Sequence, residues 1–419
     1  MIKYLGSKRV LLPVLGTLAQ GAQVQTAWDL FCGTTRVSQE FKRRGIRVTA
    51  NDLATYSYHL ARCYIETDIA SVDLDELSDT IARLNALPGK EGYVTQVFCR
   101  ESRYFQPKNG MRIDAIRDCI EQDYKQSWMY SLLLTSLMLA ADRVDSTVGV
   151  QMAYLKKWAA RSFNDLELRI PQIPEGPSGY ALCEDANELT KHCADAKAAG
   201  VLQKKKSIDD ASSSPQASTD AQGRSLALFE KDNAVSGDTM RCSASVLHDN
   251  PPDLVYMDPP YNQHKYFSNY HIWETLVRWD NPEAYGVARK RIDARDTHNA
   301  SPFNSKPRIY AALSQLFTSC QTMGARMAMV SYNDESWVTR NAMELALEKA
   351  GWEHVQTLGF ESKRYVGSQI GVHNQKGHRV GTPGHDRNIE YIFLAGEKAL
   401  IAEAIHALES SEQVLYKAY

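Results

Sequence analysis

The residues best suited to chemistry form the run "DPPY" at positions 258 to 261. The apolar segment "LVYM" before it predicts a buried strand, so we expect Asp258 at that strand's carboxyl end, where open α/β sheets bind ligands. Pro259 and Pro260 stiffen the backbone and remove two N–H donors, which leaves carbonyl groups free to accept hydrogen bonds. Tyr261 adds a flat aromatic face. The run therefore predicts a site that accepts hydrogen bonds from an amino group and stacks on the ring bearing it.

The segment "DLFCGTT" at 29 to 35 is a second candidate site. Asp29 ends a predicted strand, Gly33 permits close backbone approach, and the helix that follows offers unpaired N–H groups to a ligand. Asp52 ends the next predicted strand, about 20 residues after this turn, where doubly wound folds place a ribose-binding carboxylate. Alone, Asp52 would be read as a helix cap, and the turn lacks a GxGxxG pattern. Their spacing favours a nucleoside ligand.

A parallel sheet is needed to bring these segments together. Residues 24–60 alternate strand and helix signals, which predicts a βαβ unit. Strand signals return at 252–258, 326–333, 354–360 and 389–396, and a helical pattern occupies 337–351. We therefore predict an α/β fold built on a parallel sheet.

Changes in composition along the chain predict its organisation. Residues 1–98 are expected to form the cofactor half of a catalytic domain. Residues 99–170 are expected to form a helical insertion that is a possible target-recognition region. Residues 171–203 and 226–419 are expected to form the catalytic half with DNA-contacting loops. The polar, Ser- and Ala-rich segment 204–225 is short of large apolar residues, so we expect a flexible linker there.

Composition excludes several classes of protein. The 419 residues carry 48 Lys and Arg against 50 Asp and Glu, a formal net charge of -2, so no global field attracts a polyanion or a membrane. The eight cysteines form no CxxC pair, and no metal site is expected. The longest apolar segment, from Trp128, is too short to cross a bilayer, and no secretory signal is expected. These features predict a soluble, cytoplasmic protein.

Taken in order, "KYLGSK" (3–8), "DLFCGTT", Asp52 and "DPPY" resemble the motifs of the D12 class (Dam-like, alpha-group) of adenine-specific DNA N6-methyltransferases. The resemblance covers most of the chain apart from the expected linker. It implies the Rossmann-like fold of class I S-adenosylmethionine-dependent methyltransferases, an α/β fold with a doubly wound, mixed sheet, here with a helical insertion. It also implies methyl transfer from S-adenosylmethionine to the N6 amino group of adenine. Further similarity in "NQHKYFSNYHIWETLVRWDNPE" and "KRYVGSQIG" implies the type II restriction-modification branch.

The resemblance assigns roles to the motif residues by position. Asp258 and the Pro259 carbonyl would hold the target amino group, Pro260 would stiffen that corner, and Tyr261 would stack on the adenine. The residues that would bind the cofactor are Tyr4, Lys8, Asp29, Phe31, Gly33 and, for the ribose, Asp52. One departure is Thr35, since the family often has a second glycine at that position, and it predicts a loop slightly farther from the cofactor.

The family also uses an acidic residue after a third strand to contact the cofactor's adenine. Asp185 in "YALCEDANEL" and Asp238 in "AVSGDTMRCSAS" are both candidates. We favour Asp238, by a small margin, because the helix expected after it leads directly into the strand before Asp258.

Double-stranded DNA is the expected substrate, and the adenine must be flipped out of the duplex to be reached. The segment 262–270 is a candidate for a loop that closes over the base. Local basic clusters at 287–308 and 361–387 are candidate phosphate contacts, among them Arg289, Lys290, Arg291, Arg295, Lys306 and Arg308. A separate restriction endonuclease is a candidate partner, and we expect a monomer.

Two other functions fit part of the pattern. The first is an RNA or protein-glutamine methyltransferase, because Asp/Asn-Pro-Pro-Tyr also occurs in enzymes that act on those amino groups. The position of "KYLGSK" ahead of the glycine turn argues against it. The second is a catalytically silent DNA- or cofactor-binding subunit, against which the intact "DPPY" run argues.

Overall fold

The computed structural model describes residues 2–3, 8–199, 251–261, 266–296, 301–363, 387–411 and 416–418. The expected linker at 204–225, Tyr4, Asp238 and most of the basic loop 361–387 lie outside these residues.

In the described part of the chain, eight strands form one mixed sheet in the order β10-β8-β9-β7-β4-β1-β2-β3. The strands are β1 (Thr26–Asp29), β2 (Arg47–Asn51), β3 (Tyr180–Leu182), β4 (Leu254–Met257), β7 (Met327–Asn333), β8 (His354–Lys363), β9 (Arg387–Gly396) and β10 (Lys417–Ala418). Strands β3, β2, β1, β4 and β7 run parallel, whereas β9 is antiparallel to both β7 and β8. This is the fold of class I S-adenosylmethionine-dependent methyltransferases, so the fold prediction is confirmed.

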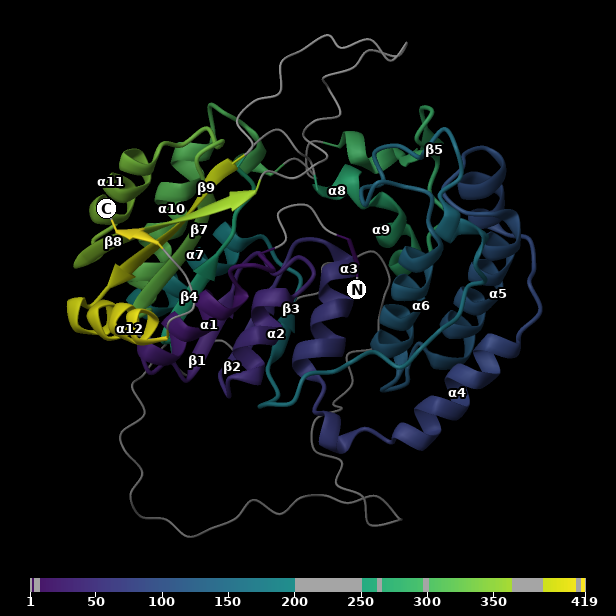
Figure 1. Cartoon of the computed structure of the whole chain (residues 1–419), viewed down its shortest axis with the longest axis horizontal. Coiled ribbons are helices and arrows are strands. Elements are labelled where there is room, and N and C mark those ends of the chain that lie inside the picture. Colours follow the sequence, from purple (N-terminus) through teal and green to yellow (C-terminus); the bar gives the residue numbers. More distant parts are fainter. Residues whose placement is uncertain are drawn as a thin grey trace.

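Helices cover both faces of the sheet (Figure 1). Because side chains on both faces are buried, the central strands are continuous apolar runs and do not alternate between apolar and polar residues. All four residues of β4 are buried. One face packs against α1 (Leu12–Gly21), α2 (Arg36–Arg43) and α12 (Lys398–Ser410). The other packs against α7 (Ala186–Ala198), α10 (Ile309–Thr322) and α11 (Arg340–Lys349).

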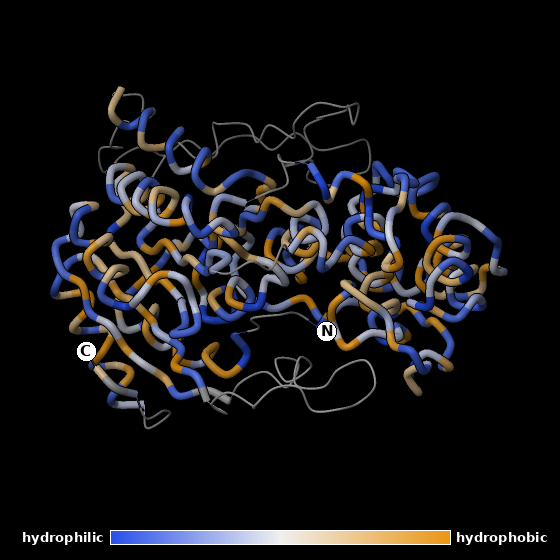
Figure 2. The backbone as a smooth tube through the Cα atoms, turned by 90° about the horizontal axis from the view of Figure 1, so that it is seen from above, coloured by the Kyte–Doolittle hydropathy of each residue, from blue (hydrophilic) through white to orange (hydrophobic). Residues whose placement is uncertain are grey.

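A helical part lies beside the sheet on the side of β3 (Figure 1). It comprises α3 (Thr55–Ala61), η1 (Arg62–Glu66), η2 (Ile69–Ser71), α4 (Leu74–Ala86), η3 (Val94–Arg100), α5 (Pro107–Tyr124), α6 (Tyr130–Val144), η4 (Ala160–Phe163), α8 (Tyr266–Asn269) and α9 (His271–Arg278). Apolar stretches run through both this part and the sheet part (Figure 2). The helices thus begin well before residue 99, and the domain boundaries and recognition role given above stay predictions. Among the described residues, no helix is both long and apolar enough to cross a bilayer.

Smaller elements complete the fold. A separate hairpin pairs β5 (Ala284–Tyr285) with β6 (Lys290–Arg291), and two 3-10 turns follow it, η6 (Ile292–Arg295) and η8 (Pro302–Asn304). The turn η8 leads into α10 and contributes to the pocket described next.

Candidate active site

A pocket of about 140 Å³ lies at the carboxyl ends of four neighbouring parallel strands. It straddles β1 and β4, where the strand order of the sheet changes direction, which is the usual ligand position in open α/β sheets. The residues that line it follow β1, β2, β3 and β4 or come from α8 and η8: Leu30, Phe31, Asp52, Leu53, Ala54, Glu184, Asp185, Ala186, Asp258, Pro260, Tyr266, Phe267, Ser301 and Asn304. The two motifs that the sequence singled out therefore share one cavity.

Asp52 is fixed at the pocket by two backbone hydrogen bonds. Its Oδ2 accepts from the Gly33 amide at 2.8 Å, and its Oδ1 accepts from the Ala54 amide at 2.9 Å. Burial raises the pKa of Asp52, and these two amide contacts oppose that rise. A carboxylate has about four lone-pair positions, so each oxygen can still accept a hydroxyl. The N-cap of α3 is Ala54 and no side chain caps it, so Asp52 holds the turn before this helix and does not cap it. Its role as a ligand acceptor stays a prediction.

The turn between β1 and α2 is tight because two of its residues have left-handed backbone conformations. Gly33 has φ +50° and Thr35 has φ +60°, a region that favours glycine. The Thr35 side chain is fully buried; its hydroxyl donates to the Thr34 carbonyl and accepts from Gln39 Nε2. The threonine that departs from the family pattern therefore does not line the described pocket, and its own hydrogen bonds hold the strained conformation.

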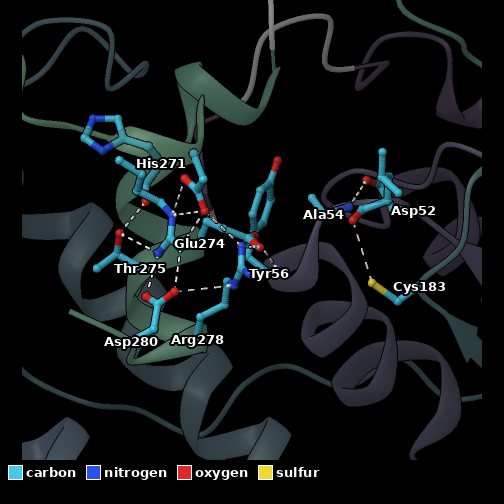
Figure 3. A network of polar contacts seen from close by, with 12 residues as sticks. Asp52, Ala54, Tyr56, Cys183, His271, Glu274, Thr275, Arg278 and Asp280 are labelled. Carbon is cyan, nitrogen blue, oxygen red and sulfur yellow. Dashed lines mark hydrogen bonds and ion pairs between the residues drawn. The ribbon is translucent and has the colours of Figure 1, made fainter. Parts of the chain in front are cut away.

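Helix α9, which follows the "DPPY" run, anchors the first turn of α3, which follows Asp52 (Figure 3). The buried Glu274 carboxylate accepts from the Tyr56 amide at 3.2 Å. Arg278 lies between Glu274 and Asp280, at 3.7 Å from each. Burial raises the pKa of Glu274, opposed by the hydroxyl of Thr55 and by Arg278. This network joins α9 to α3, the helix that follows Asp52.

Replacing Glu274 with alanine is expected to lower the free energy of unfolding by about 2–4 kcal/mol, because it leaves a buried amide without its acceptor and opens a cavity. Glu274→Gln keeps the shape and one acceptor, so we expect it to cost less than half as much. Urea unfolding followed by circular dichroism measures both variants. If both variants lost the same free energy of unfolding, the charge of Glu274 would be what stabilises α3, and not its packing or its hydrogen bond with the Tyr56 amide.

Asp185 lines the pocket directly after β3 and is the N-cap of α7. Its Oδ1 accepts from the amides of Asn187 and Glu188. Asp238, which the sequence slightly favoured for the cofactor's adenine, lies outside the described residues. The location of Asp185 at the same strand edge as Asp52 favours Asp185 for that role, and the choice stays a prediction.

Asp258 follows β4 and pairs with Lys8, whose Nζ lies 3.2 Å from its Oδ1. Lys8 Nζ also lies 3.3 Å from Oε2 of Glu390 on β9. Burial raises the pKa of Asp258 to about 6, opposed by the Lys8 ammonium group and assisted by Glu390. Burial alone would lower the pKa of Lys8, but the two carboxylates outweigh it and raise that pKa well above its ordinary value. Lys8 is not among the pocket-lining residues, so its cofactor role stays a prediction.

Pro260 lines the pocket beside Asp258, whereas the Tyr261 ring does not line it. The Tyr261 ring packs edge-on against Tyr332, with centroids 5.6 Å apart. Burial raises the pKa of Tyr261 to about 12, so the phenol is neutral at pH 7. Its stacking role, like the role of the Pro259 carbonyl, stays a prediction.

Phe31 and Asp29 both precede Gly33 in the chain, but only Phe31 lines the pocket. Phe31 lines the pocket and packs edge-on against Phe303. Asp29 is buried and does not line the pocket, and its Oδ2 accepts from Ser38 Oγ at 2.5 Å. Burial raises the pKa of Asp29 to about 7. A direct contact between Asp29 and a cofactor, like that of Tyr4, stays a prediction.

The basic cluster at 287–308 is partly engaged within the protein. Arg291 is 1 % exposed and pairs with Asp280 and Asp293 at 2.6 and 2.8 Å, so its assignment as a phosphate contact is wrong. Arg289 pairs with Glu101 at 3.2 Å. The burial of Arg291 could not be predicted from the sequence. Its acidic partners lie in a loop and a turn, and the charge pattern does not show that these segments fold onto Arg291.

Comparison with known proteins points to one family. Residues 4–198 and 212–333 match the model of the D12 class N6 adenine-specific DNA methyltransferases. The type II methyltransferase M.NlaIII of Neisseria lactamica is 27% identical over 358 residues, covering 83% of this chain and 86% of that protein. The modification methylase StsI of Streptococcus sanguinis and the type II methyltransferase M.FokI of Planomicrobium okeanokoites are each 26% identical. They match 83% and 84% of this chain, which spans 46% and 47% of their lengths.

Proposed function

We propose that this chain, which belongs to the D12 class of N6 adenine-specific DNA methyltransferases, transfers a methyl group from S-adenosylmethionine to the N6 amino group of a flipped adenine in duplex DNA. One observation carries the proposal. The carboxylates of Asp52 and Asp258 and the ring of Pro260 line a single cavity at the carboxyl edge of the sheet. This shared position supports the roles proposed for Asp52 as ribose acceptor and for Asp258 as amino-group acceptor.

The residues present fit the proposed cofactor. Asp52 retains lone pairs for two ribose hydroxyls, and Phe31 offers an apolar wall. Asp185 and Glu184 add carboxylate acceptors after β3, to which the amino group of the cofactor's adenine could donate. S-adenosylmethionine, when bound, would supply a methyl group already activated by attachment to a sulfonium.

The protein's own contribution is positioning and charge. The N6 lone pair of adenine is delocalised into the ring, and acceptors aimed at its two protons make it more available. Asp258 and the Pro259 carbonyl are the proposed acceptors. On transfer N6 would gain the methyl group, and the cofactor's sulfur would keep the electron pair of the bond that is broken. N6 then carries a positive charge, which the Asp258 carboxylate stabilises until a proton leaves to solvent.

A flipped adenine must find a surface that replaces its stacking partners. Tyr266 and Phe267 of α8 line the cavity directly after the catalytic run, and Tyr261 lies before them. We propose that this aromatic segment receives the base. The residues 262–265 between them lie outside the described part of the chain.

The names of the relatives suggest a biological setting. All three are described as modification or type II methyltransferases. We propose that this chain is likewise the modification enzyme of a type II restriction-modification system. It would act as a cytoplasmic monomer on double-stranded DNA, with a separate restriction endonuclease as partner.

The purified protein is expected to transfer labelled methyl from S-adenosylmethionine to duplex DNA, and not to RNA or protein given in parallel. Modification-aware sequencing of DNA from cells that express the gene should then show N6-methyladenine in one sequence context. Labelled methyl found in RNA or protein alone would instead favour an enzyme that methylates amino groups of RNA or of protein glutamine. Cofactor binding without transfer to any acceptor would favour a silent subunit.

A further inference from the structure

A second carboxylate, Glu390, shares the lysine that contacts the catalytic aspartate. Lys8 Nζ lies 3.2 Å from Asp258 Oδ1 and 3.3 Å from Glu390 Oε2. The three side chains are 6, 21 and 17% exposed, respectively, so water screens their charges only partly. They come from the segment before α1, the end of β4 and the strand β9.

The sheet fixes the position of Glu390. In the antiparallel pairs β7–β9 and β8–β9, Glu390 is opposite both Asn333 and Phe360. Its backbone therefore lies within the hydrogen-bonded sheet, close to the carboxyl end of β7. This support makes Glu390 a firmer anchor for a long, flexible lysine side chain than a residue on a loop would be.

The charges of the three groups explain why two carboxylates are useful. Lys8 and Asp258 alone would form a pair without net charge before methyl transfer, because the ammonium group offsets the catalytic carboxylate. With Glu390 the cluster carries one net negative charge. The proposed reaction puts a positive charge on N6, and a net negative site of low polarity stabilises that charge more strongly in the transition state than before it.

We propose that Glu390 is a positioning residue of the methyl-transfer site: it holds Lys8 in place beside Asp258 and leaves the site with a net negative charge when N6 becomes cationic. This inference rests on the proposed function, since it names a further residue of the same site. The sequence offered one signal for it, an isolated glutamate in the otherwise apolar strand "IEYIFLAG".

The two partners of Asp258 act on its ionisation in opposite directions. Lys8 lowers the pKa of Asp258 and Glu390 raises it, around a value of about 6. Among the described residues, Asp29 and three tyrosines also interact with Asp258: Tyr256, Tyr261 and Tyr266. Burial raises the pKa of all four groups, so the tyrosines are neutral at pH 7. Removing the charge of Glu390 and removing the charge of Lys8 should therefore shift the pKa of Asp258 in opposite directions. General disruption of the site would not produce such opposite shifts.

Glu390→Gln is expected to lower kcat about 10-fold or more, with KM for DNA and for the cofactor changed less than about 2-fold. Because the glutamine removes a negative charge, the acid limb of kcat should move to lower pH. Lys8→Met should move that limb to higher pH. Glu390→Asp, which keeps the charge, should restore the wild-type limb. Glu397→Gln, at an exposed carboxylate just after β9 that pairs with Arg326, is the matched control and should behave as wild type.

A second readout does not depend on activity. The carboxyl carbon of Asp258, assigned by its loss in Asp258→Asn, can be titrated by NMR in protein labelled with carboxyl-13C aspartate. Its pKa should fall in Glu390→Gln and rise in Lys8→Met. Unchanged kcat and titration in Glu390→Gln, or shifts of the same sign in both variants, would overturn the inference. Absence of methyl transfer by the wild type would instead overturn the proposed function and leave this titration as the test of the charge coupling.

Discussion

Asp258→Ala is expected to lower methyl transfer to DNA at least about 10³-fold, because it removes the charged acceptor for the N6 protons at the position where positive charge develops. Asp258→Asn keeps one oxygen acceptor and loses the charge, so we expect an intermediate loss of about 10²-fold. Single-turnover transfer of labelled methyl, with cofactor affinity measured separately by calorimetry, distinguishes the chemical step from binding. Activity in Asp258→Ala within 10-fold of wild type would refute the catalytic assignment.

The same substitution should leave the fold intact, which makes the loss of activity interpretable. The ordinary pKa of Asp258 is 3.8, and burial raises it to about 6 in the folded protein. Between these values the unfolded chain ionises first, so the contribution of Asp258 to stability falls as pH rises from about 4 to about 6. Above that window, removal of the carboxylate relieves this penalty and offsets the loss of one partner of Lys8.

The melting temperature of Asp258→Ala at pH 8 should therefore stay close to the wild-type value. Asp334→Ala is a matched control, since Asp334 is an exposed carboxylate just after β7, the neighbouring strand. It should keep both activity and stability. A large fall in melting temperature for Asp258→Ala alone would mean that the aspartate is needed for the fold.

The parts of the site that could be predicted are those in which sequence position alone fixes spatial position. Asp52 and Asp258 each follow an apolar strand, and the carboxyl ends of parallel strands meet at one edge of the sheet. Gly33 could be singled out because its turn joins a strand to a helix, and its φ of +50° agrees with that reasoning. The βαβ pattern was enough to predict the parallel pairing of β1 with β2, whereas the full doubly wound, mixed sheet was implied by the family resemblance.

The parts that could not be predicted depend on contacts between distant segments. Glu390 meets Lys8 across 382 residues of chain, and Glu274 meets the Tyr56 amide across 218. No spacing rule connects such pairs, because they exist only once the sheet and the helical part have packed. Arg291 is the opposite case, since its charge resembles a DNA contact until folding buries it against Asp280 and Asp293.

Tyr261→Ala is expected to reduce kcat about 10- to 100-fold while the cofactor dissociation constant changes less than about 3-fold, because stacking of a base on an aromatic ring contributes about 1–3 kcal/mol. In the structure, Tyr332 supports the Tyr261 ring edge-on from the apolar cluster beneath it. Tyr261→Phe keeps the ring and should retain most activity.

Duplex DNA with 2-aminopurine at the target position reports the extrahelical base by its fluorescence, and Tyr261→Ala should alter that signal at saturating DNA. Tyr332→Phe, which preserves the edge-on contact, is the control. Equal losses of turnover and cofactor affinity in Tyr261→Ala would contradict the stacking role, since a ring that serves only the flipped base has no reason to weaken binding of the cofactor.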